Sequence, residues 1–192
     1  MSVARILEPQ VRRWTKSEYD GLARQGWFQD QRVQLIHGEI IQMPPHGHAH
    51  FQMLSRVAEM LQRAFGPGYW VRVQGPLDLP MDSLPEPDVA VVKGTLEEYR
   101  AHPTTALLAV EVRDSTLRLD RRKASLYAAS GILDYWLVNM GRQQLEVYRD
   151  PVPDVNEEFE HRYSEPIILK RSDVVAPVAL PHVTIRVEDI FK

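Results

Sequence analysis

Two acidic side chains lie in stretches that otherwise have the pattern of buried strands. Glu111 interrupts the apolar run ALLAVEV (106–112), and Asp88 lies near the start of PDVAVV (87–92). Burying an unpaired charge costs far more than burying an apolar side chain, so each carboxylate needs a partner. If neighbouring strands bring the two together, their repulsion raises at least one pKa unless a cation lies between them. Mg²⁺ or Mn²⁺ suits such a place, because sites with one or two carboxylates hold hard cations that keep several waters.

The same two residues also allow an ordinary interpretation. Asp88 can be a turn residue after Pro87, and Glu111 can face water from a strand at the edge of the sheet. The two stretches alone leave both interpretations open.

A lysine on the next predicted helix bears on this choice. One stripe of that helix should face the sheet and consists of Leu119, Leu126, Tyr127 and Ser130. Lys123 lies near the middle of the stripe, so it either extends outward along its aliphatic stem or meets negative charge inside. Asp120, one turn earlier, is an alternative partner. Two strand carboxylates and an inward lysine would form a site for phosphodiester hydrolysis, in which a metal activates water and the lysine orients it or stabilises the developing charge.

Three histidines precede the long helix that is predicted from His48 onward. His46 and His50 are four residues apart, a spacing that zinc sites use, but no acidic third ligand follows nearby in the sequence. We therefore interpret His50 as structural or substrate-facing, and His46 and His48 as loop residues. Tyr127 and Trp136 are expected in the core, and Tyr127 could also touch the site from the helix flank.

The composition limits the class of protein. A chain of 192 residues that is 44% hydrophobic and 26% charged predicts one globular domain with a real core. Because cysteine is absent, disulfides, zinc–thiolate sites and thiol nucleophiles are excluded. No apolar run approaches the roughly 20 residues that span a bilayer, and the first residues lack the apolar core of a signal peptide, so we expect a cytoplasmic protein.

The net charge of −3 gives no general attraction for nucleic acid, but basic residues cluster in two places. The clusters consist of Arg5, Arg12, Arg13 and Lys16, and of Arg118, Arg121, Arg122 and Lys123. Each cluster can also be an ordinary solvated face.

The elements that must position these residues follow from sequence patterns. A capping box at Thr15 and Glu18 predicts a helix over 16–24, and His37-Gly38 between two apolar runs predicts a hairpin. Helical spacing of apolar residues predicts a long amphipathic helix over 48–65.

The remaining chain is predicted to supply most of a sheet. Strands are expected within 69–79, 85–92, 106–112, 134–140 and 143–150, with a helix over 117–131 that ends at Gly131. The segment 151–160 is expected to be a Pro-rich acidic loop, followed by short strands, turns and a final helical turn. This order predicts an α/β or α+β protein in which layers pack around one mixed sheet.

These motifs, in this order, resemble the Uma-two family of restriction endonucleases, which belongs to the PD-(D/E)XK nuclease-like superfamily. The matching stretches are QLIHGE (34–39), His50, PDVAVV (87–92), VEVRDST (110–116) and DRRKASLYAASGILDYWLV (120–138), and the resemblance runs from about Trp14 to Phe191. It implies a restriction-endonuclease-like core, a mixed sheet flanked by helices, with a divalent metal.

The resemblance also implies roles for individual residues. Asp88 and Glu111 match the two acids of the superfamily motif, while Arg113 stands where its lysine normally does and Lys123 takes the place of that lysine. Val112 could lend its backbone carbonyl to the metal. Glu39 is a candidate further ligand, whereas Gln34 replaces a glutamate that is common in the family. Asp114, Ser115 and Thr116 would form the turn toward the Lys123 helix.

The leading hypothesis is a DNA endonuclease dependent on Mg²⁺ or Mn²⁺, with Asp88, Glu111 and Lys123 as its catalytic residues. The alternative is a non-catalytic protein of the same fold that binds nucleic acid or acts as a scaffold; a hydrolase of another phosphodiester or nucleotide is a third. A homodimer is expected, because cutting both strands usually calls for two active sites. Residues 1–192 are expected to form a single domain, with 1–45 as an N-terminal extension.

Overall fold

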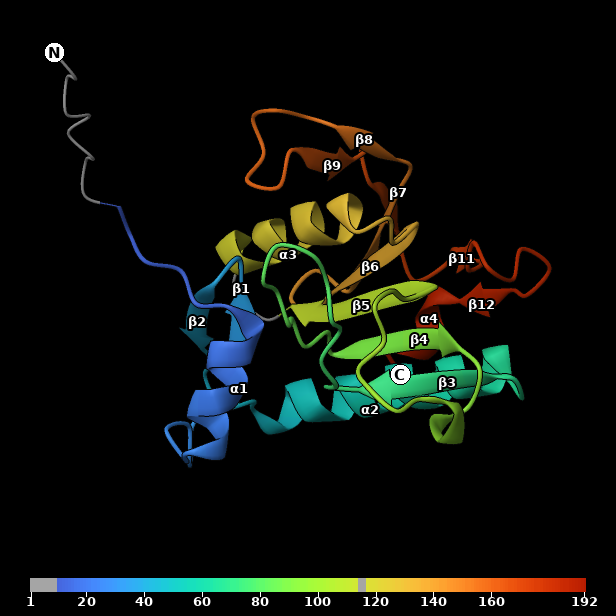
Figure 1. The fold of residues 1–192 in the computed structure, drawn as a ribbon. Coiled ribbons are helices and arrows are strands. Elements are labelled where there is room, and N and C mark those ends of the chain that lie inside the picture. The colour runs from blue at the N-terminus through green and yellow to red at the C-terminus, as the bar shows by residue number, and fades with distance from the viewer. Residues whose placement is uncertain (1–9, 114–116) are drawn as a thin grey trace, which may run out of the picture.

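A six-stranded sheet forms the centre of the computed structural model, which describes residues 10–113 and 117–192 (Figure 1). Its strand order is β10-β7-β6-β5-β4-β3. The strands are β3 (Tyr69–Val73), β4 (Val89–Lys93), β5 (Leu108–Arg113), β6 (Asp134–Asn139), β7 (Gln144–Arg149) and β10 (Ile167–Leu169). β5 and β6 run parallel and the other neighbours antiparallel, so the predicted mixed sheet is confirmed.

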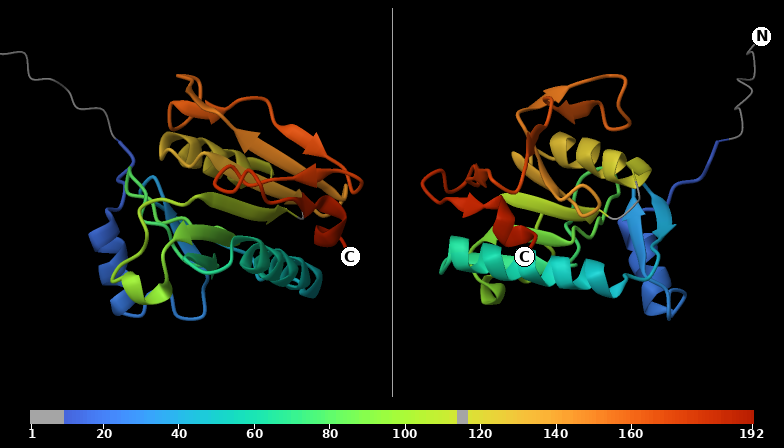
Figure 2. Two further views of the ribbon diagram at one scale, coloured as in Figure 1. Left: turned by 90° about the vertical axis from the view of Figure 1, so that its right-hand side faces the viewer. Right: turned by 180° about the vertical axis from the view of Figure 1, so that it is seen from behind.

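Two helices cover the sheet from opposite sides (Figures 1 and 2). α2 (His48–Phe65) has the predicted bounds, and its apolar stripe packs on one face of the sheet. α3 (Leu117–Ala129) packs on the other face through Leu126 and Tyr127. A restriction-endonuclease-like core with helices on both faces is therefore observed, as expected.

The alternation of β5 decides which helix each of its side chains meets. Val110 and Val112 belong to the core layer under α2, and Ala109 belongs to the layer under α3. Side chains two apart share a face, so Glu111 lies on the α3 side. β5 has neighbours on both edges, which excludes the interpretation of Glu111 as an edge-strand charge that faces water.

The N-terminal segment forms a helix and a hairpin beside the sheet (Figure 1). α1 (Lys16–Arg24) begins with the predicted capping box between Thr15 and Glu18. β1 (Val33–Ile36) and β2 (Glu39–Gln42) pair through a turn in which His37 has φ 51° and Gly38 φ 69°. A Cβ on Gly38 would also lie 2.5 Å from that of Arg13, so this turn requires glycine.

The segment after β7 differs from the predicted loop. β8 (Pro151–Pro153) pairs with β9 (His161–Tyr163) in a two-stranded ribbon, whose free edges tolerate proline. β9 packs against α3, and Ala128 of α3 and Tyr163 of β9 belong to the same buried core layer.

The chain ends with β11 (Val174–Val175), β12 (Ile185–Arg186) and the predicted final helical turn, α4 (Val187–Ile190). A short 3₁₀ helix, η1 (Leu96–Glu98), follows β4. Within 10–113 and 117–192, no helix is both long and apolar enough to cross a bilayer.

Asp134, the first residue of β6, is a fully buried charge with a structural role. Its Oδ1 accepts hydrogen bonds from Trp136 Nε1 and Arg149 Nε, both at 2.9 Å, and its Oδ2 accepts one from the Val178 amide at 2.8 Å. This carboxylate thus ties β6 to β7 and to the C-terminal segment.

We expect Asp134→Ala to lower the free energy of unfolding by about 3–5 kcal/mol, because it removes a buried carboxylate on which three donors converge. Urea titration followed by circular dichroism measures the change. Asp20→Ala, at an exposed position of α1, is the control and should change it by less than about 0.5 kcal/mol. Equal stability of the two variants would contradict the role given to Asp134.

Candidate active site

Glu111, Lys123 and Tyr127 meet between β5 and α3. Lys123 Nζ donates a hydrogen bond to Glu111 Oε1 at 2.9 Å, and the Tyr127 hydroxyl donates to the same oxygen at 2.8 Å. Glu111 is only 6% exposed and Lys123 2%. The inward orientation of Lys123 is confirmed, and the carboxylate that it meets is Glu111 rather than Asp120.

Asp88 lies directly before β4, at the same end of the sheet as Glu111. The β4–β5 register ends with Val89 opposite Val110, so the next positions outward are Asp88 and Glu111. Asp88 Oδ2 accepts a hydrogen bond from the Val112 amide at 2.8 Å. Its Oδ1 lies 3.3 Å from His50 Nε2. One carboxylate oxygen is thus held by the backbone of β5, and the other faces the start of α2.

The surroundings move the pKa values of the two carboxyl groups in opposite directions. Burial raises the pKa of Glu111 to about 7, although Lys123 opposes this and Asp88 adds to it. Burial also disfavours the charge of Asp88, but hydrogen bonds from His50 and Val112, with the charge of Lys123, hold its pKa below the usual value. Asp88 is therefore ionised at neutral pH, while Glu111 titrates near it; separated pKa values of this kind are typical of acid–base sites.

The first hairpin is connected to this site by the side-chain amide of Gln34, through Glu86. Lys123 Nζ also donates to the carbonyl of Glu86 at 3.2 Å, and the Glu86 amide donates to Gln34 Oε1 at 3.2 Å. Gln34 is only 1% exposed. Glu39, the predicted further ligand, instead forms ion pairs with Arg13 at 3.2 Å and Arg122 at 3.0 Å. The structure therefore places Gln34, and not Glu39, next to the residues that contact Lys123.

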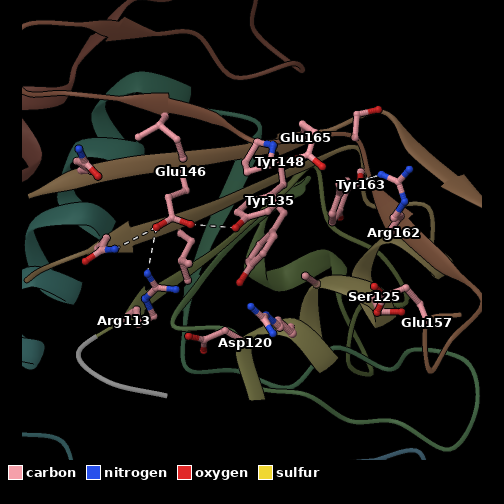
Figure 3. Close-up of a pocket in the computed structure, with 18 of the residues that line it drawn as sticks. Arg113, Asp120, Ser125, Tyr135, Glu146, Tyr148, Glu157, Arg162, Tyr163 and Glu165 are labelled. Carbon is pink, nitrogen blue, oxygen red and sulfur yellow. Dashed lines mark hydrogen bonds and ion pairs between the residues drawn. The ribbon is translucent and has the colours of Figure 1, made fainter. Parts of the chain in front are cut away.

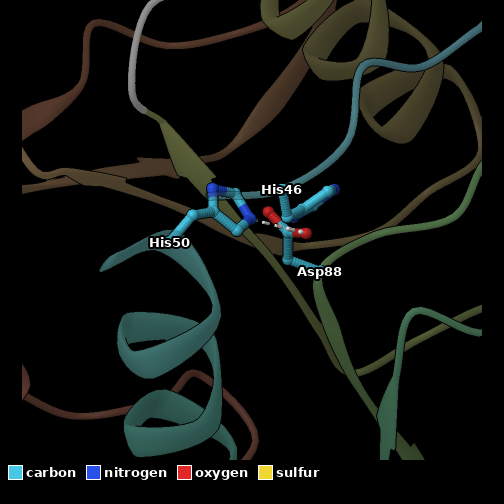
Figure 4. Close-up of side chains that lie close together, drawn as sticks. All are labelled: His46, His50 and Asp88. Atoms are coloured by element: carbon cyan, nitrogen blue, oxygen red, sulfur yellow. Dashed lines mark hydrogen bonds and ion pairs between the residues drawn. The ribbon is translucent and has the colours of Figure 1, made fainter. Parts of the chain in front are cut away.

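Two histidines lie beside Asp88 (Figure 4). His46 precedes α2, His50 lies in its first turn, and their ring centroids are 4.0 Å apart. The potential ligand atoms of His46, His50 and Asp88 all lie within 4.8 Å of one another. Sequence patterns indicate no acidic partner for the histidine pair, because Asp88 comes 38 residues after His50. His48, expected in a loop, is the exposed first residue of α2.

Arg113 lies on the same face of β5 as Glu111, two positions along the strand. Its Nη2 donates to Glu146 Oε1 at 3.1 Å, and that oxygen also accepts from Asn139 Nδ2 at 3.0 Å. These residues line a cleft of about 760 Å³ on the α3 side of the sheet, together with Asp120 and others (Figure 3). Arg113 is therefore held toward β7, two residues along β5 from Glu111.

Two buried polar atoms of that cleft, Asp120 Oδ2 and the Tyr135 hydroxyl, have no hydrogen-bond partner within the described part of the chain. Burial raises the pKa of Asp120 to about 6. Asp120 is thus a second carboxyl group near Lys123 that titrates close to neutral pH.

Several of the basic residues that cluster in the sequence form ordinary ion pairs in the structure. Arg12, Arg13 and Lys16 each form an ion pair with a carboxylate, and Arg122 pairs with Glu158, so these residues resemble an ordinary paired surface more than a basic patch. The role of the Val112 carbonyl stays a prediction. Arg5 and the turn residues Asp114, Ser115 and Thr116 lie outside the described residues.

Comparisons with known proteins agree with this architecture. A family model described as "Uma2: Putative restriction endonuclease" matches residues 17–188. The crystal structure of "a putative nuclease belonging to DUF820 from Anabaena variabilis ATCC 29413" superposes with a TM-score of 0.73, over 92% of this chain and 97% of that chain. The two sequences are 16% identical, so this likeness shows the fold alone. No curated protein matches the chain.

The raised pKa of Glu111 predicts a pH-dependent stability in metal-free buffer. Its ordinary pKa is 4.5 and its folded value about 7, so between these values the folded chain binds more protons than the unfolded chain. The contribution of Glu111 to the free energy of unfolding therefore falls as pH rises from about 4.5 to 7, by on the order of 3 kcal/mol.

Urea titrations at several pH values in this window, with EDTA present, measure the slope. Glu111→Gln should remove most of it, while Glu97→Gln, an exposed substitution in η1, should keep it. Asp120 contributes a slope of the same sign, so the difference between wild type and Glu111→Gln isolates Glu111. Parallel slopes for wild type and Glu111→Gln would contradict the prediction.

Proposed function

The chain belongs to the Uma2 family, and from this premise we propose that it is a metal-dependent endonuclease that hydrolyses DNA phosphodiester bonds. The observation that carries the proposal is the buried pair between Glu111 on an interior strand and Lys123 on α3, with ionised Asp88 at the same end of the sheet. Two acidic residues and a lysine are the catalytic residues that the sequence motifs imply.

The donors fit a divalent cation, Mg²⁺ or Mn²⁺, held by Asp88 and Glu111 with the Val112 carbonyl. The raised pKa of Glu111 supports this, because burial and, to a smaller extent, the charge of Asp88 disfavour its ionised form more than Lys123 favours it, and a bound cation would stabilise that ionised form. A metal bound there would polarise the phosphoryl oxygen and activate a water molecule.

The protein side chains have separate tasks in this proposal. Tyr127 and Lys123 both contact Glu111 Oε1, so they fix the orientation of that carboxylate. Lys123 also has its ammonium group at the site, where it would orient the attacking water or stabilise the charge that develops on the phosphoryl oxygens. Val112 fixes Asp88 through its amide.

Two further inferences concern the whole molecule. We infer that residues 1–192 form a single domain with 1–45 as its N-terminal extension, which the Leu35–Leu84 bridge and the Gln34–Glu86 hydrogen bond support. A homodimer would supply two sites for cutting both strands of DNA.

Substitution of the proposed catalytic residues should abolish cutting. We expect Asp88→Asn, Glu111→Gln and Lys123→Met each to slow cleavage of plasmid DNA at least about 100-fold with Mg²⁺ or Mn²⁺, because each removes a metal ligand or the charge that assists the reaction. Gel assays of nicked and linear product measure the rates. Lys93→Met and Glu97→Gln, at exposed positions, are matched controls that should cut like wild type. An Asp88→Asn variant as active as wild type would refute the assignment.

A second candidate function is a non-catalytic module that binds nucleic acid or serves as a scaffold. Two observations favour it: Arg113, at the usual lysine position, is engaged by Glu146, and Gln34 stands where the family commonly has a glutamate. Wild type that binds DNA in mobility-shift assays, but leaves plasmid, linear and branched DNA uncut with either metal, would favour this candidate over the nuclease.

A further inference from the structure

The histidine pair beside Asp88 brings nitrogen donors to a place where the proposed nuclease chemistry uses oxygen donors (Figure 4). We propose that His46, His50 and Asp88 form a three-donor binding site for a transition-metal ion of the Co²⁺ or Zn²⁺ type, in preference to Mg²⁺. The inference deepens the proposed function and rests on it in one respect, since Asp88 belongs to both sites.

The local backbone presents the two imidazoles on the same side of the helix start. Gly47 caps α2 in an extended conformation, with φ −71° and ψ 160°, and its carbonyl accepts the Phe51 amide. His46 therefore precedes the cap and His50 lies in the first turn. Their rings meet edge to face at an interplanar angle of 87°.

The third donor comes from the sheet. Asp88 Oδ2 is held by the Val112 amide, and its Oδ1 lies 3.3 Å from His50 Nε2 and 3.5 Å from Gln74 Nε2. A tetrahedral ion with bonds of about 2.1 Å places its ligand atoms about 3.4 Å apart. The spacing of His50 and Asp88 thus matches two positions of such an ion, and His46 lies within reach of a third.

The donor types determine which ion fits. Imidazole nitrogen suits Zn²⁺, Co²⁺ and Ni²⁺, whereas Mg²⁺ prefers oxygen ligands and retains most of its waters. Catalytic zinc sites also have three protein ligands, in some cases two imidazoles and one carboxylate, and the fourth position holds water. A transition metal at this site would therefore keep a place for water next to Asp88.

A simpler role for His50 is a hydrogen bond to Asp88 without an ion. The two roles differ in what they require of His46. A hydrogen bond between His50 and Asp88 does not need the second ring, whereas an ion bound by three donors loses a ligand when His46 is removed. His46 is therefore the position that separates them.

Isothermal titration calorimetry of the metal-free full chain, without DNA, tests the proposal. Wild type should bind one Co²⁺ per chain at least about tenfold more tightly than Mg²⁺, and Co²⁺ bound by imidazole should change its visible absorption. His46→Ala and His50→Gln should each weaken Co²⁺ binding at least about tenfold. Glutamine at position 50 can still donate a hydrogen bond toward Asp88, which protects the fold.

His48→Ala is the matched control, because His48 is the exposed neighbour of both residues. It should bind Co²⁺ like wild type, and thermal melts of all variants should show that each is folded. Equal Co²⁺ affinity of wild type, His46→Ala and His48→Ala would overturn the proposal.

Failure of this inference and failure of the nuclease proposal give different results. A wild type that binds Co²⁺ through His46 but cuts no DNA supports the metal site and contradicts the nuclease. If wild type cuts DNA with Mg²⁺, but His46→Ala binds Co²⁺ as tightly as wild type does, the result supports the nuclease and contradicts the metal site.

Discussion

The buried carboxyl group of Glu111 inside an interior strand is the constraint on which the arrangement of the protein depends. A carboxylate there must be compensated, and the compensation comes from one helix, through Lys123 and Tyr127. Removing one partner of a buried pair typically costs about 3–5 kcal/mol, which favours the position of α3 that keeps Lys123 in contact with Glu111. The apolar stripe of α3 provides the packing energy, but the ion pair fixes which residue lies over which strand.

Asp88 connects this end of the sheet to α2, on the opposite face from α3. It lies where the β4–β5 ladder ends, so its carboxylate receives a backbone amide from β5 on one oxygen and the imidazole of His50 on the other. The charge of Lys123 acts on it from the α3 side. Groups from both helices thus act on the same end of the sheet, where two neighbouring acids have pKa values shifted in opposite directions.

The parts of this arrangement that depend on local sequence could be predicted, and those that depend on distant segments could not. The bounds of α1 and α2 follow from a capping box and an apolar stripe, and the inward direction of Lys123 follows from the period of α3. The acid beside His46 and His50 was missed because Asp88 is brought there by the sheet. The β8–β9 ribbon was missed for a similar reason, since prolines indicate a loop until a partner strand and a helix surface are known.

The position of the lysine has a geometric explanation. A residue two places after Glu111 shares its face but lies about 6.5–7 Å farther along the strand, and there Arg113 meets Glu146 from β7. A lysine on α3 approaches Glu111 from above the sheet instead, and contacts its carboxylate directly. The ammonium group is therefore in place only when α3 is docked through Leu126 and Tyr127. In this protein the packing of a helix, rather than the spacing of two residues on one strand, brings the proposed catalytic charge to the acid.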